Sequence, residues 1–254
     1  SQFRPGPAPA VTSERYTRDY NEVKEKGGTL SHPAAGGCPA PAGTDMARFW
    51  SGNFGLQWNQ AARDMAVDRQ LGLGDTARLL ALANMAGGDA AIAVWDSKVH
   101  YYVWRPITAI NLGKDNGNNK TEGDPAWVPF IGGAHFPAGS QTPPYPDYVS
   151  GANGLTGAFT AMLQLFFHTD NVPFEIYKAV PASVAICTNP RSFRRISDAA
   201  EEVVDARILL GIHFRFADTV ARTLGSRVAW HVFANELRPL RRDWDNDDGH
   251  DHDD

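Results

Sequence analysis

Residues 150–166 read SGANGLTGAFTAMLQLF, and this stretch carries the clearest fold signal in the sequence. Its large apolar side chains recur at spacings of three and four residues, which places them on one face of an α-helix: Leu155, Phe159, Met162, Leu163 and Phe166. A helix with one apolar face has to bury that face against other elements. The stretch therefore predicts a helix that begins near Ser150 and packs in a core.

The same periodicity predicts helices on both sides of this stretch. Upstream, Asp75 is placed to cap a long helix that runs to Pro106, because proline disfavours helical geometry in the residue before it. Downstream, Ser197 or Asp198 can cap a further helix, and a last helix follows it. The apolar positions of these two helices are Ala200, Val203, Val204 and Ile208, then Val220, Leu224, Val228, Val232 and Phe233. No alternating strand pattern stands out, so the sequence predicts an all-α helical bundle.

Composition divides the chain into three parts. Residues 1–43 are rich in proline, glycine and small polar residues and are predicted to form an extended N-terminal arm, with a short charged helix over Glu14–Lys26. Residues 44–240 hold the helical domain, which includes a long Gly/Pro-rich loop over 112–149. Residues 241–254 form an acidic tail with seven aspartates and two histidines. A solvated acidic segment is the favoured interpretation of this tail, with metal binding as the alternative.

The overall composition excludes several classes of function. The chain has 254 residues, 43% of them hydrophobic, and a formal net charge of -5, so it predicts a globular protein without a nucleic-acid-binding surface. No window approaches the roughly 18 apolar residues of a transmembrane segment. Cys38 and Cys187 are compatible with one disulfide or with two unrelated thiols. The start at Ser1 is compatible with removal of a targeting segment, and we expect a secreted or periplasmic protein.

Three separated segments carry residues suited to binding an oxyanion. Lys98 and Arg105 are seven residues apart, which on one helix would place both cations on nearly the same face. Ser150 and Gly151 lie at a predicted helix start, where unpaired N–H groups attract anions. Each pattern alone is also compatible with a role that involves no ligand: a solvated basic face for the first and a simple helix cap for the second.

The third segment, ARILLGIHFRFAD, spans residues 206–218 and adds two further candidates. Arg207 could supply a third cation to the same anion, and the imidazole of His213 could serve as a ligand or a nucleophile. A lone histidine in an apolar stretch is more often structural. This segment therefore indicates a binding or catalytic site only in combination with the other two.

Taken together, in this order and at these separations, the segments resemble vanadium-dependent haloperoxidases and type 2 phosphatidic acid phosphatases. The resemblance spans roughly residues 44–237, and the stretches ARFW, KVHYYVWRPITAI, PPYPDYVSG and GIHFRFAD are similar to the soluble haloperoxidase branch. It implies a helical bundle of that type, with His213 binding vanadium or attacking phosphorus. It also implies that vanadate, with phosphate as a competing occupant, is held by Lys98, Arg105, Ser150, Gly151 and Arg207.

The resemblance implies a leading function and two alternatives. The leading one is a haloperoxidase that oxidises halide with hydrogen peroxide at a vanadate bound to His213. The first alternative is an acid phosphatase of the phosphatidic acid phosphatase type, which cleaves a phosphate ester through a phosphohistidine. The second is a non-catalytic, oxyanion-binding or structural subunit. Relatives commonly carry additional helices before this region, so three interpretations stay open: a shortened paralogue, a processed C-terminal part, or a subunit of a homo-oligomer or larger assembly, with the arm docked on another subunit.

The chain departs from the family pattern at two positions. Ala152 stands directly after Ser-Gly, where the family usually has a histidine that acts as the acid-base catalyst, so turnover is expected to be impaired. Ala217 stands four residues after His213, where the family often has an aspartate, and Asp218 comes one residue later. On a regular helix Asp218 would point away from His213, which favours a surface or capping role and leaves another carboxylate or a carbonyl to orient the histidine.

Other residues remain weaker candidates. By position, His135 in the long loop is the nearest replacement for the missing acid-base group, and His100 lies near Lys98 but should point away from its face. Tyr101, Tyr102 and Trp104 could line a substrate pocket, although core packing is the more common role of helical aromatics.

Overall fold

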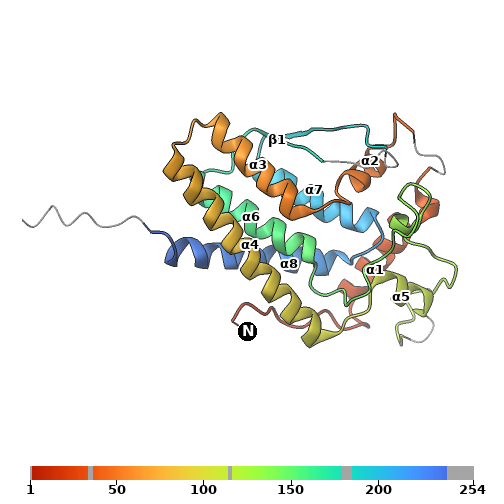
Figure 1. Cartoon of the computed structure of the whole chain (residues 1–254). Coiled ribbons are helices and arrows are strands. Elements are labelled where there is room, and N and C mark those ends of the chain that lie inside the picture. The colour runs from red at the N-terminus through yellow and green to blue at the C-terminus, as the bar shows by residue number, and fades with distance from the viewer. Residues whose placement is uncertain (1, 34–36, 114–115, 179–184, 239–254) are drawn as a thin grey trace, which may run out of the picture.

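The computed structural model describes residues 2–33, 37–113, 116–178 and 185–238, and the acidic tail lies outside these ranges. Four long helices make the body of the fold: α3 (Phe54–Asp68), α4 (Leu73–Tyr101), α6 (Gly151–Phe167) and α8 (Arg215–Asn235). They are joined by α7 (Ile196–Leu209), by three shorter helices and by two 3₁₀ turns (Figure 1). The shorter elements are α1 (Glu14–Lys26), α2 (Ala42–Phe49), α5 (Pro106–Asn111), η1 (Thr29–Ser31) and η3 (Phe130–Gly132). The predicted all-α fold class is confirmed.

The helix that decides the fold, α6, lies between α4, α7 and α8 in the middle of the molecule (Figure 1). Phe159, Met162 and Leu163 are buried as the periodicity predicts, while Leu155 and Phe166 are partly buried against the same core. The apolar faces predicted for α7 and α8 also face this core. One helix therefore organises the packing of the other three.

The backbones of α6 and α8 touch where glycines meet. A Cβ built on Gly225 would lie 2.1 Å from the carbonyl oxygen of Gly154, and one built on Gly157 would lie 2.2 Å from that of Arg222. Side chains larger than hydrogen cannot occupy these two positions unless the helices move apart. The glycine-rich first half of α6 thus permits a close helix contact.

The structure corrects the predicted bounds of α4. The helix begins after Gly72, so Asp75 lies inside its first turn and does not cap it. It ends at Tyr101, because Tyr102 adopts a left-handed conformation with φ of 49°. Pro106 does not end this helix but begins α5, in keeping with the preference of proline for the first helical position.

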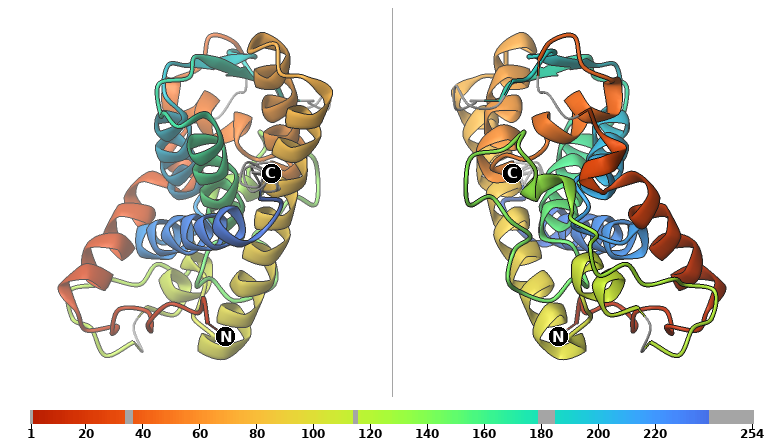
Figure 2. Two further views of the ribbon diagram at one scale, coloured as in Figure 1. Left: turned by 90° about the vertical axis from the view of Figure 1, so that its left-hand side faces the viewer. Right: turned by 90° about the vertical axis from the view of Figure 1, so that its right-hand side faces the viewer.

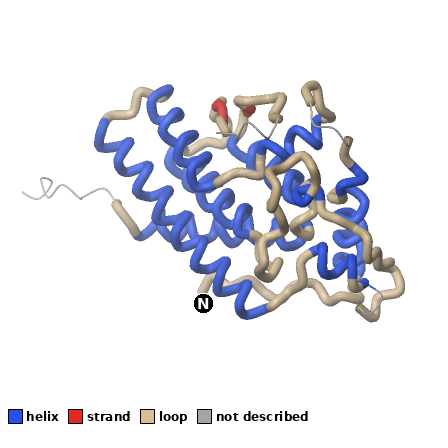
Figure 3. The backbone as a smooth tube through the Cα atoms, turned by 45° about the vertical axis from the view of Figure 1, so that its right-hand side comes forward, coloured by secondary structure: helices blue, strands red, loops and turns tan. Residues whose placement is uncertain are grey.

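Two further predictions are wrong: the cap of α7 and the absence of strands before it. Arg195 occupies the N-cap position, so Ser197 and Asp198 lie within the first turn and neither caps the helix. A short antiparallel pair precedes it, formed by β1 (Phe174–Ile176) and β2 (Arg191–Phe193), which are the red segments of Figure 3. Strands of three residues are too short to give a readable alternation in the sequence.

The N-terminal arm packs on its own chain along the base of the molecule (Figure 2). The guanidinium of Arg4 donates to both carboxylate oxygens of Asp96 on α4, each at 2.7 Å. The hydroxyl of Tyr148 donates to the carbonyl oxygen of Gly6 at 2.7 Å. The predicted helix over Glu14–Lys26 is confirmed as α1, and it buries Tyr16, Tyr20 and Val23.

The fold answers one question that the sequence left open, the pairing of the cysteines, and corrects the prediction that no window approaches a transmembrane segment. Cys38 and Cys187 form a disulfide across 149 residues of chain. One helical stretch, Leu73–Asn111, is long and apolar enough to cross a membrane by length and composition, a criterion that core helices of soluble proteins also meet. Because α4 packs on α3, α6 and α8, this stretch is weak support for a membrane span.

Replacing Gly225 with alanine tests the α6–α8 contact. The added methyl group would collide with the backbone of α6, so we expect Gly225→Ala to lower the free energy of unfolding by about 1–3 kcal/mol or more. Urea denaturation followed by circular dichroism measures this. Gly74→Ala is the matched control, because a Cβ at that position of α4 meets no atom within 4 Å. Equal stability of the two variants would contradict the contact.

Candidate anion-binding site

Residues from all three predicted segments come together at the N-terminal end of α6. Lys98 comes from the last turn of α4, Arg105 precedes α5, and Arg207 lies in the last turn of α7. His213 lies in the short connection between α7 and α8. These four side chains are all buried, as is Ser150 at the start of α6.

Lys98 and Arg105 do not share one helix, which corrects the expectation from their spacing. Arg105 has an extended backbone (φ -71°, ψ 157°) because Pro106 follows it. The two cations nevertheless converge on one aromatic ring: Lys98 Nζ lies 5.2 Å and Arg105 Cζ 4.8 Å from the ring centroid of Tyr145. Lys98 Nζ also donates to the carbonyl oxygens of Pro146 and Asp147, at 2.7 and 2.9 Å.

His213 is oriented by Asp147, a carboxylate that the sequence analysis did not name. The Nδ1 atom of His213 lies 2.6 Å from Asp147 Oδ1, and both residues are buried. Because an ionised carboxylate can only accept, Nδ1 carries the proton and Nε2 keeps a lone pair that can accept a hydrogen bond. Arg105 Nη1 approaches this Nε2 atom to 3.3 Å. The expectation that another carboxylate orients His213 is thereby confirmed.

The charges of this cluster are strongly perturbed by burial. Burial lowers the pKa of His213 well below its usual value, and the neighbouring cations, Arg105 first, lower it further. Burial also lowers the pKa of Lys98 and raises that of Asp147. For Arg207, burial lowers the pKa to about 10. The imidazole is therefore neutral at pH 7, which leaves Nε2 able to act as a ligand or a nucleophile.

Two guanidinium groups present unused donors. Arg207 Nη1 donates to the carbonyl oxygen of Trp50 at 3.1 Å, and Arg105 donates to the carbonyl oxygens of Tyr145 and Ile212, both at 2.8 Å. Arg207 Nε and Arg105 Nη2 are buried and find no acceptor within the part of the chain that the structure describes. Buried donors without partners are costly, so this site is suited to an acceptor from outside the chain.

The start of α6 is arranged as the sequence predicts. Ser150 is the N-cap, and its hydroxyl oxygen accepts the N–H of Asn153 at 3.4 Å. Gly151 is the first helical residue, and a side chain there would meet no atom within 4 Å. Ala152 is partly buried and carries no group that can transfer a proton. The helix start thus offers backbone donors but no acid-base side chain.

Asp218 is buried in this site, so its expected surface or capping role is wrong. His213 precedes α8 rather than lying on it, so the helical offset between the two residues does not apply. Asp218 Oδ1 accepts a hydrogen bond from the side-chain amide of Asn153 at 2.8 Å, and Oδ2 has no partner among the described residues. Burial raises the pKa of Asp218 to about 7, against the effects of Ser150, Arg207 and Asn153.

The two replacement histidines considered from the sequence lie outside this cluster. His135 is buried between Arg48 and the carbonyl oxygen of Pro33, both of which contact its ring nitrogens. His100 is exposed, and its Nδ1 atom lies 3.2 Å from a nitrogen of Arg4 in the arm. Neither histidine replaces the acid-base group that is absent at position 152.

A cavity of about 460 Å³ leads from the surface to the edge of the cluster. Arg105 and Tyr145 line it together with Tyr102, Trp104 and residues 141–144 of the long loop. Tyr102 and Trp104 are exposed, so a pocket-lining role, and not core packing, holds for these two aromatics. Tyr101 instead donates its hydroxyl hydrogen to the carbonyl oxygen of Pro5 at 2.5 Å.

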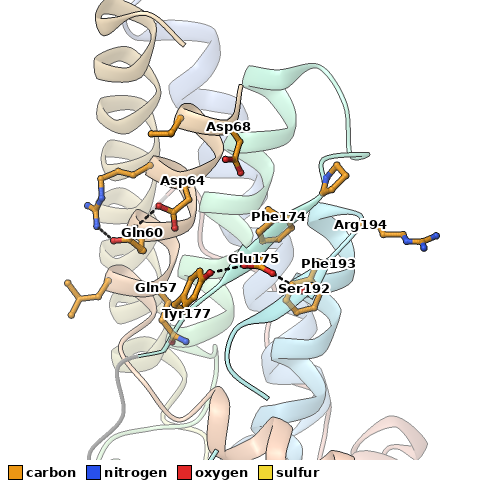
Figure 4. Close-up of a pocket in the computed structure, with 14 residues that line it drawn as sticks. Gln57, Gln60, Asp64, Asp68, Phe174, Glu175, Tyr177, Ser192, Phe193 and Arg194 are labelled. Carbon is orange, nitrogen blue, oxygen red and sulfur yellow. Dashed lines mark hydrogen bonds between the residues drawn. The ribbon is translucent and has the colours of Figure 1, made fainter. Parts of the chain in front are cut away.

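A larger depression of about 1250 Å³ lies elsewhere, between α3 and the β1–β2 pair (Figure 4). Its lining includes Gln57, Asp64, Phe174, Glu175 and Tyr177, and Figure 4 shows Tyr177 and Ser192 bonded to the carboxylate of Glu175. None of the described residues that line it belongs to the predicted anion ligands. The candidate site is therefore the buried cluster and not this larger hollow.

The buried carboxyl of Asp218 predicts a pH dependence of stability in anion-free buffer. Its pKa is about 7 in the folded protein and lower in the unfolded chain. Its stabilising contribution to the free energy of unfolding is therefore fully present below the unfolded pKa and is lost as pH rises through about 7. Asparagine cannot titrate. Between about pH 4 and pH 7 the free energy of unfolding should therefore fall less in Asp218→Asn than in the wild type, and the difference should be at most about 1.4 kcal/mol per pH unit. Urea unfolding across this range measures the difference.

The control is Asp75→Asn, which changes an exposed carboxylate in the first turn of α4. It should follow the wild-type pH profile. A profile of Asp218→Asn that runs parallel to the wild type would show that Asp218 is not held protonated in the fold.

Comparisons with known proteins identify the family of this chain. A family model described as the VCPO second helical-bundle domain matches residues 78–241. The vanadium chloroperoxidase of Curvularia inaequalis is 26% identical over 212 residues, which cover 66% of this chain and 34% of that protein.

Solved structures give the same result at the level of the fold. A bacterial vanadium-dependent iodoperoxidase is similar with a TM-score of 0.72 and 28% identity, over 92% of this chain and 53% of that one. A holo-type bacterial vanadium-dependent chloroperoxidase is similar with a TM-score of 0.65 and 18% identity, over 92% of this chain and 50% of that one. The chain thus spans about half the length of these solved relatives. Because the family model matches well over half of the sequence, the chain belongs to the second helical-bundle family of the vanadium chloroperoxidases, within the vanadium haloperoxidase superfamily.

Proposed function

We propose that this chain binds vanadate and, with hydrogen peroxide, oxidises a halide. The observation that carries the proposal is the position of His213, which is bonded to Asp147 at 2.6 Å and is buried together with Lys98, Arg105 and Arg207. The anion would be held by Lys98, Arg105, Ser150, Gly151 and Arg207, with His213 as the vanadium ligand. Phosphate, which has the same tetrahedral shape and charge, is the competing occupant.

The residues present fit such an anion. Arg207 Nε and Arg105 Nη2 are buried donors without partners among the described residues, and an oxyanion would satisfy both. The open space at Gly151 lets oxygen atoms approach the backbone N–H groups at the start of α6. A bound anion would also offset the mutual repulsion that lowers the pKa of Lys98.

Each protein group has a distinct task in this proposal. Asp147 holds the imidazole of His213 in one orientation and keeps the proton on Nδ1, so Nε2 faces the anion as an uncharged ligand. The cations Lys98, Arg105 and Arg207 stabilise negative charge in a site from which water is largely excluded. Bound vanadate would supply the activation of peroxide, which no side chain of this cluster provides.

Proton transfer is the step that this chain supports least. The side chain of Ala152 cannot donate or accept a proton, and loss of such a group typically lowers a rate by about 10²- to 10⁴-fold. Asp218, which accepts a hydrogen bond from Asn153 at 2.8 Å, has a pKa of about 7 and is one group of the cluster that could hold a proton near neutral pH. We therefore expect slow turnover.

The substrates would reach the site through the cavity of about 460 Å³ beside Tyr145. Its aromatic and proline side chains, with Arg105 at the inner end, suit a small anion or a small organic molecule. We also propose that the protein works in an oxidising compartment, outside the cytoplasm, because Cys38 and Cys187 are paired. Free thiols found by alkylation of the protein at cell harvest would argue against this compartment.

Halide oxidation tests the proposed function. Wild-type protein supplied with vanadate, peroxide and bromide or iodide should halogenate a reporter dye, and His213→Ala should abolish this activity because the vanadium ligand is gone. Binding is measured separately by vanadate titration in a calorimeter, where His213→Ala should also lose the heat of binding. His231→Ala, which changes an exposed histidine on α8, is the control and should behave as wild type.

The same assay with Ala152→His probes the missing acid-base group. Restoring the histidine should raise the halide oxidation rate by about 10²-fold or more, with little change in vanadate affinity. Hydrolysis of a phosphate ester without vanadate, inhibited when vanadate is added, would instead favour the phosphatase alternative. Anion binding without either activity, even in Ala152→His, would favour a non-catalytic subunit.

A further inference from the structure

Arg207 is held by the turn that connects α2 and α3, residues 50–53. Its Nη1 atom donates to the carbonyl oxygen of Trp50 at 3.1 Å. Its Cζ atom lies 5.4 Å from the ring centroid of Phe54, the first residue of α3. Its Nε atom is buried and has no acceptor among the described residues. The turn therefore sets the direction in which Arg207 presents its remaining donors.

Lys178, two residues after the end of β1, binds the same turn and the end of α2 before it. Its Nζ atom donates to the carbonyl oxygen of Arg48 at 2.5 Å and to Oγ of Ser51 at 2.7 Å. The first acceptor lies two residues before Trp50 in the chain, and the second directly follows Trp50. Lys178 is only 7% exposed, so both bonds are largely shielded from water. One ammonium group thus joins the two sides of the residue that holds Arg207.

The backbone of Lys178 is also fixed, so its side chain reaches the turn from a defined position. Its N–H donates to Oδ1 of Asn189 at 3.1 Å, and Nδ2 of Asn189 donates back to the carbonyl oxygen of Lys178 at 2.8 Å. Asn189 lies two residues before β2, which pairs with β1. The β1–β2 pair therefore holds Lys178 against the turn.

Lys178 also has a structural role at the end of a helix. Burial, and then repulsion from Arg207, lower its pKa to about 8, which leaves the ammonium group protonated at pH 7. Arg48 is the penultimate residue of α2, and a cation is stabilised at the C-terminal end of a helix. That contact would stabilise the fold without acting on a ligand. The two roles differ in whether the effect of Lys178 depends on Arg207.

We propose that Lys178 is a positioning residue for the anion, which holds the Arg48–Ser51 segment so that the carbonyl group of Trp50 orients Arg207 towards the site. This role rests on the proposed function, in which Arg207 binds the anion. Without the ammonium group the turn loses two hydrogen bonds, and Arg207 is no longer confined to one orientation. A guanidinium that has to be ordered by the anion itself binds it more weakly than one ordered in advance.

A double-mutant cycle with Arg207 tests the proposal, with vanadate affinity measured by titration calorimetry. Arg207→Ala should weaken binding by about 10- to 100-fold, as expected for a charged hydrogen-bond donor. Lys178→Met should weaken it by about 10-fold or less, because Glu202 still accepts the indole N–H of Trp50 at 2.7 Å. In the Arg207→Ala background, Lys178→Met should have little further effect. Lys120→Met, which removes an exposed lysine of the long loop, is the matched control and should bind as wild type.

The possible results separate this role from the proposed function. If Lys178→Met has the same effect in the presence and absence of Arg207, the charge of Lys178 acts directly and the proposal is overturned. Wild-type affinity in Lys178→Met also overturns it, while the proposed function stands. Wild-type protein that binds neither vanadate nor phosphate overturns the proposed function and the role of Lys178 with it.

A spectroscopic measurement tests the orientation of Arg207 without any anion. The Nε–H signal of Arg207 in ¹⁵N NMR spectra, identified by its loss in Arg207→Ala, should shift or broaden in Lys178→Met and stay unchanged in Lys120→Met. An unchanged signal in Lys178→Met overturns the proposal even if affinity falls.

Ser51→Ala provides a milder variant if Lys178→Met does not fold. It removes one of the two acceptors of Lys178 and should weaken vanadate binding by about 3-fold, again only when Arg207 is present. Circular dichroism and urea unfolding establish that each variant is folded at the temperature of the titration. Wild-type affinity in Ser51→Ala, with Lys178→Met unfolded, would leave Lys178 with a structural role alone and overturns the proposal.

Discussion

The start of α6 is held directly against the start of α8, and the functional cluster depends on this contact. The N–H of Ser150 donates to the carbonyl oxygen of Ala217 at 3.1 Å, and further along the helices the backbones touch at Gly157 and Gly225. Asp147 and Asn153 lie on the α6 side of this junction, and His213 and Asp218 on the α8 side. His213 therefore meets Asp147, and Asp218 meets Asn153, across the junction between the two helices. Small residues allow the helices to come close enough for these contacts.

Electrostatics then set what the cluster can hold. Three cations buried together repel one another, and two buried carboxylates with raised pKa values compensate only in part. The backbone carbonyl oxygens of Tyr145, Pro146, Asp147 and Ile212 accept most of the donors, yet two guanidinium nitrogens remain unsatisfied. An oxyanion with several acceptor atoms relieves both problems, whereas a neutral ligand relieves only the second. Alanine at position 152 brings no charge and does not alter this balance.

Tyr145 links the cluster to the outer surface of α4. Its ring centroid lies 5.2 Å from Lys98 Nζ, 4.8 Å from Arg105 Cζ and 4.8 Å from the ring centroid of Trp95, and it also lines the smaller cavity. One aromatic side chain in the loop before α6 therefore joins the buried cations, the exposed face of α4 and the cavity.

Local signals in the sequence determined the helices and the helix cap at Ser150, because periodicity, capping and turn chemistry act between residues close in the chain. The expected anion ligands came instead from the resemblance of three separated segments to a known family. Only the tertiary structure decided that Asp147 orients His213, that Asp218 is buried beside Asn153, and that Lys98 and Arg105 converge from different elements. These relations join residues as many as 66 positions apart, and no local pattern specifies which distant carboxylate a histidine will meet. The helix ends at Tyr101 and Arg195 were misjudged for a related reason, since packing and backbone conformation there prevail over the preferences of single capping residues.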